Sequence, residues 1–370
     1  MLPLEKHFGF GYMRLPLKDG EIDIDQTCQM VDEFLQAGFC YFDTAHGYLQ
    51  GRSEPSLRKC LTSRYPRERY LLANKLTNSF FKTQEEIRPL FEEQLRACGV
   101  EYFDYYLMHS QNAEIFRHFQ ACRAYETAFA LKEEGKIRHV GISFHDKAEV
   151  LEEILTRYPQ IEVVQIQFNY ADYDDPAVQS RRCYEVCLRH QKPVFVMEPV
   201  KGGHLANLPP AAEEVLRACK NGSPASYAIR FAAGFPGVEM VLSGMSSIEQ
   251  LRENVRFMRQ FQPLTPAELE AVRTVRQILQ KQNTISCTAC RYCVDGCPKQ
   301  IPIPDLFAAM NARQLYHDWN AGYYYDVHAR PGHRASDCVG CGQCEHACPQ
   351  HLPIRELLRE VAAAFETVEK

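Results

Sequence analysis

Two runs of closely spaced cysteines stand in the last quarter of the chain. The first run reads CTACRYCVDGCP and the second reads CVGCGQCEHACP, so each follows the pattern C-x2-C-x2-C-x3-C-P. Three thiolates separated by two residues can wrap one face of an iron–sulfur cubane, and each [4Fe–4S] cluster takes four thiolates. The pattern therefore predicts two [4Fe–4S] clusters. The eight predicted ligands are Cys287, Cys290, Cys293, Cys297, Cys338, Cys341, Cys344 and Cys348.

The two runs resemble the ligand segments of bacterial dicluster ferredoxins, in which the fourth cysteine of each run ligates the other cluster. The resemblance implies that Cys348 completes the cluster of the first run and that Cys297 completes the cluster of the second. A zinc ribbon also uses C-x2-C pairs, but two complete runs, each followed by proline, favour iron–sulfur. About 40 residues separate the runs, and they include a predicted helix, IPDLFAAMNARQLYHDW. This region is similar to the helical dicluster domains that act as electron wires in multi-subunit oxidoreductases.

The other eight of the sixteen cysteines are scattered through the chain. We interpret them as buried small hydrophobic residues or inert thiols. So many cysteines without a disulfide framework suit a reducing compartment. These residues are Cys28, Cys40, Cys60, Cys98, Cys122, Cys183, Cys187 and Cys219.

A second set of chemically capable residues lies in the first third of the chain. Asp43 and Tyr48 belong to FDTAHGY, Lys75 lies near the end of the segment LLANKL, and His109 ends the segment YYLMH. Tyrosine is a weak acid unless a nearby cation favours its phenolate, and a desolvated lysine can do so. An aspartate can keep that lysine charged and oriented. A histidine can orient the carbonyl group of a substrate. The four residues together predict a proton-donor site.

The elements that must position these residues are short apolar strands alternating with amphipathic helices. The segments between the strands, such as TQEEIRPLFEEQLRACG, carry helical periodicity with acidic or hydroxyl-bearing starts. Such alternation indicates a parallel sheet with helical crossovers. FGYMRLPL supplies an eighth strand, and eight strand–helix units predict a (β/α)8 TIM barrel, whose catalytic residues collect at the strand ends. The other seven predicted strands are 40–45, 70–76, 102–109, 139–145, 163–170, 193–199 and 238–244.

The four residues and their surroundings resemble the aldo-keto reductase family. The matching segments are FDTAHGY, LLANKL, YYLMHS, GIS (141–143), QIQFN (165–169) and SGMSSIEQLRENV (243–255). The resemblance covers about residues 7–260. It implies that Tyr48 is the general acid, that Lys75 favours its phenolate, that Asp43 pairs with Lys75 and that His109 orients the substrate. The implied reaction is hydride transfer between a nicotinamide and a carbonyl/alcohol pair.

The cofactor half matches the family less closely. By resemblance, Ser143 and Gln165 face the carboxamide of the nicotinamide, but Met197 stands where an aromatic residue stacks on the ring. Gly244 and Gln250 replace the basic residues that grip the adenosine 2′-phosphate. A loop before a helix N-terminus still suits a phosphate, so NADH, NADPH and a flavin phosphate all remain open. The remaining predicted contacts in that loop are Ser243, Ser246, Ser247, Glu253 and Asn254.

Composition and charge bear on the functional class and the location of the protein. The chain has 370 residues, is 45% hydrophobic and carries a formal charge of -5. This balance argues against a nucleic-acid-binding surface, and neither a signal peptide nor a membrane-spanning run is visible. We expect a cytoplasmic protein. The expected domains are the barrel over 1–262, a connecting helix over 263–283, and a small, mostly α-helical 2×[4Fe–4S] ferredoxin-type domain over 284–370.

Three functional hypotheses follow. The chain is a carbonyl-reducing oxidoreductase with an attached dicluster domain; or an electron-transfer protein whose barrel binds a flavin or docks a ferredoxin or flavoprotein partner; or an enzyme whose clusters are structural or sense oxygen. The difficulty is one of electron count. A nicotinamide passes two electrons as hydride, whereas each cluster normally passes one, and a flavin is the usual converter.

Overall fold

The computed structural model describes residues 7–174, 178–280, 284–316 and 321–366. The chain forms two compact units. The first unit comprises Met1–Pro199 and Ala225–Pro266, and the second comprises Val200–Pro224 and Ala267–Lys370. The segment 200–224 thus leaves the first unit in the middle of its sequence. None of the described helices combines the length and the apolar character needed to cross a bilayer.

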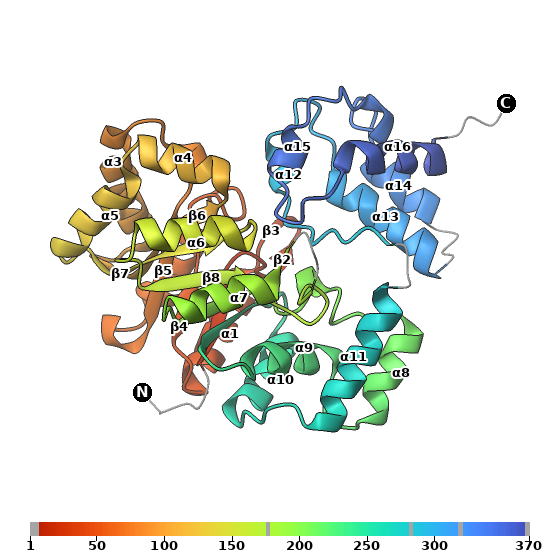
Figure 1. The fold of residues 1–370 in the computed structure, drawn as a ribbon, viewed down its shortest axis with the longest axis horizontal. Coiled ribbons are helices and arrows are strands. Elements are labelled where there is room, and N and C mark those ends of the chain that lie inside the picture. Colours follow the sequence, from red (N-terminus) through yellow and green to blue (C-terminus); the bar gives the residue numbers. More distant parts are fainter. Residues whose placement is uncertain (1–6, 175–177, 281–283, 317–320, 367–370) are drawn as a thin grey trace. The chain divides into compact units, whose positions relative to one another are not determined.

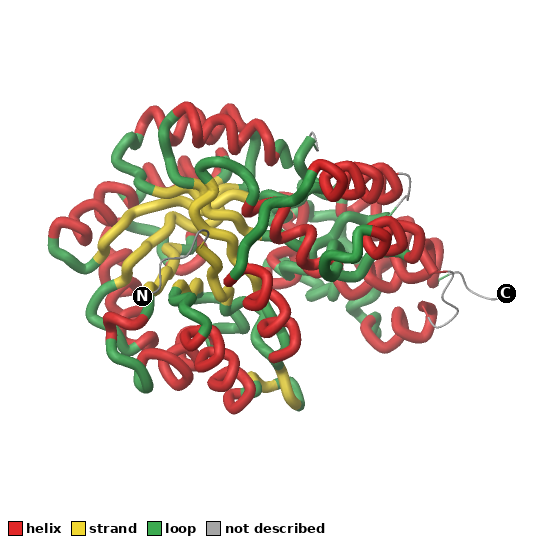
Figure 2. Tube along the Cα trace, turned by 90° about the horizontal axis from the view of Figure 1, so that it is seen from below, coloured by secondary structure: helices red, strands yellow, loops and turns green. Residues whose placement is uncertain are grey.

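The first unit is a closed barrel of eight parallel strands, which Figure 2 shows ringed by helices. The strand order is β1-β10-β9-β8-β7-β6-β5-β4, so each strand from β4 to β10 pairs with its neighbour in sequence and β1 closes the ring. This is the predicted (β/α)8 barrel. The strands are β1 (His7–Gly11), β4 (Tyr41–Asp43), β5 (Leu71–Leu76), β6 (Phe103–Gln111), β7 (Ile137–Phe144), β8 (Val163–Gln167), β9 (Val194–Met197) and β10 (Val238–Gly244).

Seven of the eight predicted strands are confirmed, and the prediction for the eighth is wrong. FGYMRLPL overlaps β1 only at its first two residues, because the strand is HFGFG. Glycine is disfavoured in strands, which is why this segment did not read as one. The structure gives the reason for Gly9: a Cβ there would lie 2.3 Å from Leu242 Cδ2. The crowded barrel interior therefore requires a residue without a side chain.

The barrel interior is filled by a layer of side chains from successive strands. Outside the ring, Phe34 of helix α1 (Ile24–Gln36) packs on Phe10 and Phe42, with ring centroids 5.7 and 5.3 Å away. Burial of such aromatic pairs on both faces of the strands stabilises the ring. The interior layer consists of Tyr41, Ala73, Leu107, Val163, Phe195, Met240 and Leu242.

Helices of the first unit cover the outside of the barrel, as Figure 1 shows. Several of the predicted helices are confirmed, among them the segment TQEEIRPLFEEQLRACG, which forms α3 (Gln84–Cys98). Besides α1 and α3, the α-helices that the structure describes in this unit are α2 (Ser53–Leu57), α4 (Ala113–Ala121), α5 (Ala124–Glu133), α6 (Ala148–Arg157), α7 (Ser180–Arg189), α9 (Pro224–Ala233) and α10 (Ile248–Arg259). An antiparallel pair, β2 (Leu17–Lys18) and β3 (Glu21–Ile22), lies outside the ring.

The second unit is helical and includes both cysteine runs. The predicted helix between the runs is confirmed as α13 (Ile303–Tyr316); residues 317–319 of that prediction lie outside the described residues. In the hydrophobic core of the second unit, Leu306 and Phe307 pack with residues of the last helix. The buried Cys293, Cys344 and Cys348 belong to the same core. The remaining helices are α8 (Pro210–Ala218), α11 (Pro266–Gln280), α12 (Tyr292–Asp295), α14 (Ala321–His328), α15 (Gln343–His346) and α16 (Ile354–Phe365).

Candidate active site and cluster-binding cysteines

Alternation along the barrel strands places the predicted site residues on the inner face of the ring. Successive side chains of a strand point to opposite faces, so residues two apart share a face. Asp43 lies two residues after Tyr41 of the interior layer. Lys75 stands in the same relation to Ala73. His109, Gln165 and Met197 follow other members of this layer in the same way. These residues therefore lie above the interior layer, at the carboxyl ends of their strands. Barrel enzymes have their catalytic residues at this end.

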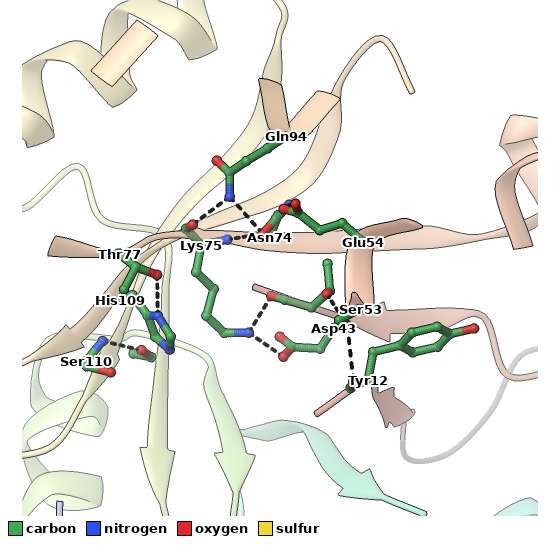
Figure 3. A network of polar contacts seen from close by, with 12 residues as sticks. Tyr12, Asp43, Ser53, Glu54, Asn74, Lys75, Thr77, Gln94, His109 and Ser110 are labelled. Atoms are coloured by element: carbon green, nitrogen blue, oxygen red, sulfur yellow. Dashed lines mark hydrogen bonds and ion pairs between the residues drawn. The ribbon is translucent and has the colours of Figure 1, made fainter. Parts of the chain in front are cut away.

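Lys75 is the centre of the polar network drawn in Figure 3. Its ammonium forms an ion pair with Asp43 and donates to the Thr44 carbonyl at 2.7 Å. Both side chains of the pair are almost fully buried, at 1% and 5% exposure. Burial lowers the pKa of Lys75 and raises that of Asp43, and the ion pair opposes both shifts. The same ammonium lies 4.8 Å from the centroid of the Tyr48 ring.

Tyr48 reaches this position from the loop between β4 and α2. Leu49 and Gln50, directly after it, both adopt left-handed backbone conformations, with φ of 52° and 59°. Such conformations are costly for residues with side chains and cluster where the surrounding structure has a function. Hydrogen bonds from Ser53 brace the loop, because its hydroxyl contacts that of Thr44 at 2.7 Å and donates to the Tyr12 carbonyl at 3.1 Å.

His109 faces the tyrosine across the site. The two rings are 5.9 Å apart between centroids and nearly perpendicular, at 73°. The His109 Nδ1 contacts the Thr77 hydroxyl at 2.7 Å, which fixes the ring orientation. Burial lowers the pKa of His109 well below its ordinary value, and the Lys75 charge adds to this effect. The imidazole is therefore neutral at neutral pH and can orient a carbonyl without carrying charge.

A buried amide and carboxylate network lies behind Lys75, and the sequence analysis missed it. Asn74 donates to Glu54 at 2.8 Å, and its own carbonyl accepts from Gln94 at 3.1 Å. The second oxygen of Glu54 contacts His46 Nδ1 at 2.9 Å, and this bond raises the pKa of His46. The protonated form of His46 is thus favoured beside this buried carboxylate. The one sequence signal was Asn74 itself, a polar residue at a position that β alternation turns away from the barrel interior.

The three predicted nicotinamide contacts stand on adjacent strands. Ser143 and Gln165 are direct partners in the parallel pairing of β7 and β8. The Ser143 hydroxyl accepts the Ser110 amide at 2.8 Å. Gln165 is only 4% exposed, yet its side-chain oxygen has no hydrogen-bond partner. Buried polar atoms nearly always form a hydrogen bond. This oxygen therefore fits a site in which a ligand amide donates a hydrogen bond to it. Met197 is half-buried at the end of β9.

The predicted phosphate-loop residues run from the end of β10 into the first turns of α10. The Ser247 hydroxyl caps the helix by accepting the Gln250 amide at 3.3 Å. The Gln250 side chain in turn accepts the Ser246 amide at 2.8 Å. Asn254 donates to Ser243 at 3.4 Å, so these two are linked as well. Glu253 is half-buried on the same helix.

Arg14 is a cation beside this loop that the sequence analysis did not find. A Cβ at Gly244 would lie 3.1–3.3 Å from three side-chain carbons of Arg14, so the arginine stem covers that glycine. The Arg14 carbonyl accepts the Ser246 hydroxyl at 2.9 Å, and its guanidinium lies 3.8 Å from Glu198. Arg14 follows β1 and is 230 residues away from Gly244 in the chain. A contact of that sequence separation leaves no local pattern by which to recognise it.

The cysteines of the first run come together with the last cysteine of the second. Cys287, Cys290, Cys293 and Cys348 line one cavity, together with apolar neighbours such as Phe307. Burial raises the pKa of the Cys293 thiol, and the other three cysteines of the cavity reinforce the shift. The donor set therefore fits one four-thiolate cluster, with the fourth ligand taken from the other run.

The other four cysteines of the two runs form a second group. Burial raises the pKa of Cys344 to about 11, with contributions from Cys338 and from Cys297 of the first run. Cys341 is the exposed member of this group. Among the described residues, no three histidine, cysteine or carboxylate side chains converge as a single metal ion requires. A cluster makes a different demand, because each of its irons takes one thiolate and the thiolates surround a common space.

Most of the scattered cysteines are buried, as predicted. All sixteen are unpaired by disulfides, and six of the scattered eight are buried. Burial raises the pKa of Cys183 to about 12 and that of its helix neighbour Cys187 higher still. These thiols are protonated at neutral pH, which suits small core residues rather than nucleophiles.

The model of the Aldo/keto reductase family matches residues 7–277, nearly three-quarters of the chain. The chain belongs to the aldo/keto reductase family. The 4Fe-4S dicluster domain model matches residues 286–352, immediately after the reductase match. This aldo/keto reductase is therefore an oxidoreductase with a C-terminal iron–sulfur domain, as the sequence predicted.

Two curated relatives and a solved structure are similar to about seven-tenths of this aldo/keto reductase. An uncharacterised oxidoreductase, YqkF of Bacillus subtilis, is 24% identical over 283 residues, which is 68% of this chain and 87% of the relative. The L-galactose dehydrogenase of Arabidopsis thaliana is 26% identical over 71% of this chain and 89% of its own. An aldo-keto reductase of Klebsiella pneumoniae, solved in complex with NADPH, shares the fold with a TM-score of 0.57. Its sequence is 19% identical, and the match covers 73% of this chain and 90% of the solved one.

Proposed function

We propose that this aldo/keto reductase interconverts a carbonyl and an alcohol, with Tyr48 as the general acid and base. The observation that carries the proposal is the buried Lys75 ammonium, paired with Asp43 and lying over the Tyr48 ring. A bound nicotinamide would supply or accept the hydride. The proton moves between the Tyr48 hydroxyl and the substrate oxygen, and the adjacent ammonium stabilises negative charge that develops on the phenol.

His109 orients the substrate in this scheme. Its ring is held by Thr77 and is neutral, so it can direct an N–H at a carbonyl oxygen without competing for the proton of Tyr48. The nicotinamide amide would be met by Ser143 and by the unpartnered oxygen of Gln165. Arg14 is proposed to supply the cation for a cofactor phosphate, in place of the basic residues missing at Gly244 and Gln250. NADPH, the ligand of the Klebsiella reductase, thus remains a suitable cofactor.

The test of the barrel chemistry is Tyr48→Phe. We expect turnover with NADPH or NADH to fall by roughly 10²–10⁴-fold, the usual contribution of general acid–base catalysis. Tyr41→Phe is the matched control, because it removes a buried hydroxyl without a partner from the same segment. Turnover by Tyr48→Phe at the wild-type rate would contradict the assignment.

We further propose that the eight clustered cysteines hold two [4Fe–4S] clusters with exchanged fourth ligands, Cys348 for the first and Cys297 for the second. When bound, the clusters would supply one-electron transfer to a ferredoxin or flavoprotein partner. The shared cavity of Cys287, Cys290, Cys293 and Cys348 supports this arrangement. Anaerobically purified protein should contain about eight irons per chain, and partner reduction should bleach the cluster absorbance.

A structural role for the clusters is the second candidate. It is favoured by one observation: Cys293, Cys344 and Cys348 belong to the hydrophobic core of the second unit. Clusters bound there would brace the core whether or not they pass electrons. Absorbance that never bleaches with reduced partner or with substrate would favour this role over electron transfer. A flavin band in the same spectra would instead support a flavin-binding barrel.

A further inference from the structure

The segment that follows β9 packs against the first cysteine run. Gly202 lies in a tight turn, Lys201–Gly203, with a left-handed φ of 64°. A Cβ at this position would lie 2.3 Å from the carbonyl oxygen of Thr288, which is a backbone atom that cannot move aside cheaply. The backbone of the turn therefore touches the backbone of the residue after Cys287. Glycine is required here both by its conformation and by this contact.

Two side chains of the same turn reach both ligand-bearing segments of the first cavity. Lys201 is buried, at 7% exposure, and its ammonium donates to the Gln350 side-chain oxygen at 3.3 Å. Gln350 lines the cavity of the four cysteines and stands two residues after Cys348. His204 Nε2 contacts the carbonyl of Cys287. All of these residues belong to the second compact unit.

A buried ammonium beside a cluster cavity has an electrostatic consequence. Charge near an iron–sulfur cluster and hydrogen bonding around it set its reduction potential. A reduced cluster carries one more negative charge than its oxidised form, so a buried cation nearby stabilises the reduced form preferentially. The effect is large because a buried charge is poorly screened.

We propose that the turn Lys201–His204 is the outer shell of the first cluster, and that Lys201 raises the reduction potential of that cluster above what its thiolates alone would set. The inference rests on the proposed ligation of the first cluster by Cys287, Cys290, Cys293 and Cys348. The turn belongs neither to the four proposed catalytic residues nor to the two cysteine runs.

Lys201→Met tests the charge. In the anaerobic holoprotein, we expect an EPR-monitored redox titration to show one of the two clusters becoming harder to reduce. The expected shift is at least tenfold in the ratio of reduced to oxidised cluster, which is about 59 mV for one electron. The second cluster is the internal control, and Lys201→Arg should restore most of the wild-type potential because it keeps the charge.

Two glycine variants test the contact. Gly202→Ala and Gly203→Ala introduce the same methyl group at adjacent left-handed positions, with φ of 64° and 104°. At Gly203 the nearest atom to the new Cβ is 4.0 Å away, on the Asn207 side chain, so only Gly202→Ala collides with Thr288. We expect Gly202→Ala to alter the EPR spectrum of one cluster or to lose its iron, and Gly203→Ala to retain both clusters unchanged.

The outcomes separate the two levels of inference. Wild-type protein that holds no iron when purified anaerobically overturns the proposed ligation and this inference with it. Two intact clusters whose potentials are the same in Lys201→Met as in wild type overturn only the role of Lys201. Identical cluster spectra in the two glycine variants overturn the role of the turn as outer shell.

Discussion

The candidate catalytic centre of the barrel and the cysteine cavity of the second unit are organised differently. In the barrel, Lys75 has protein partners in place, because Asp43 and the Thr44 carbonyl accept its ammonium. In the second unit, Cys287, Cys290, Cys293 and Cys348 surround a cavity instead of bonding to one another. The Lys75 ion pair of the barrel is therefore complete within the chain, whereas the core of the second unit surrounds a space that fits an added group.

The difference predicts which part of the protein depends on its cofactor. Iron removal by anaerobic chelation should unfold the second unit and leave the barrel folded, since metal-binding free energy contributes directly to the folding of such domains. Hydrogen exchange is the measurement: amides of α13 and α16 should lose protection while those of β5 and β6 keep it. Continued protection of α13 and α16 after complete loss of iron would contradict the comparison.

Breaking the barrel ion pair tests the opposite half. Lys75→Met leaves the Asp43 carboxylate buried without its partner, which should lower the free energy of unfolding by about 3–5 kcal/mol. The matched control is Arg88→Met, which breaks an exposed pair with Glu134 and should leave the free energy of unfolding nearly unchanged. Urea denaturation of the three proteins gives the comparison. Equal costs for the two variants would mean that Lys75 is not electrostatically central.

The role of Arg14 sharpens the view of the cofactor half. Loss of a charge-assisted hydrogen bond costs about 1.5–3 kcal/mol, so Arg14→Ala should weaken NADPH binding by roughly 10–100-fold. Titration calorimetry measures this directly, and Arg14→Lys should recover part of the affinity. Arg252→Ala is the control, because this arginine of α10 pairs with Glu33 at 2.7 Å instead. Equal losses in both variants would remove Arg14 from the cofactor site.

The buried His109 predicts a smaller, pH-dependent effect. Its pKa is lowered in the folded protein, whereas in the unfolded chain it titrates near about 6.5. Below about pH 6.5 the unfolded state binds a proton that the folded state does not bind. The free energy of unfolding therefore decreases as the pH is lowered, by at most about 1.4 kcal/mol per pH unit. His109→Gln should flatten this dependence in urea denaturation at pH 7 and pH 5.

His46 supplies the contrast within the same experiment. Hydrogen bonding to Glu54 raises its pKa, so its contribution to stability is present below about pH 6.5 and is lost as pH rises through the raised value. His46→Gln should therefore lower the free energy of unfolding mainly at acidic pH.

The His109 prediction has its own contradicting outcome. If the free energy of unfolding of His109→Gln decreased more steeply below pH 6.5 than that of wild type, His109 would not be neutral in the folded protein.

The sequence predicted most of the fold because the relevant patterns are local. Seven strands were found from short apolar runs, and the barrel followed from their alternation with helices. The eighth strand escaped because Gly9 and Gly11 are poor strand formers, and only the packing of Leu242 explains why glycine is needed. The division into units was also beyond local patterns, because residues 200–224 join the second unit through contacts with distant segments.

By itself, the sequence determined which residues are available for chemistry. The spacing of eight cysteines and the positions of Asp43, Tyr48, Lys75 and His109 at strand ends are visible without coordinates. Only the tertiary structure decided which distant residues lie against these predicted positions. Arg14 covers Gly244, and Lys201 reaches Gln350 at a separation of 149 residues. The physical reason is that periodicity and spacing record neighbours along a helix or strand, whereas contacts made by chain closure depend on the packing of the whole unit.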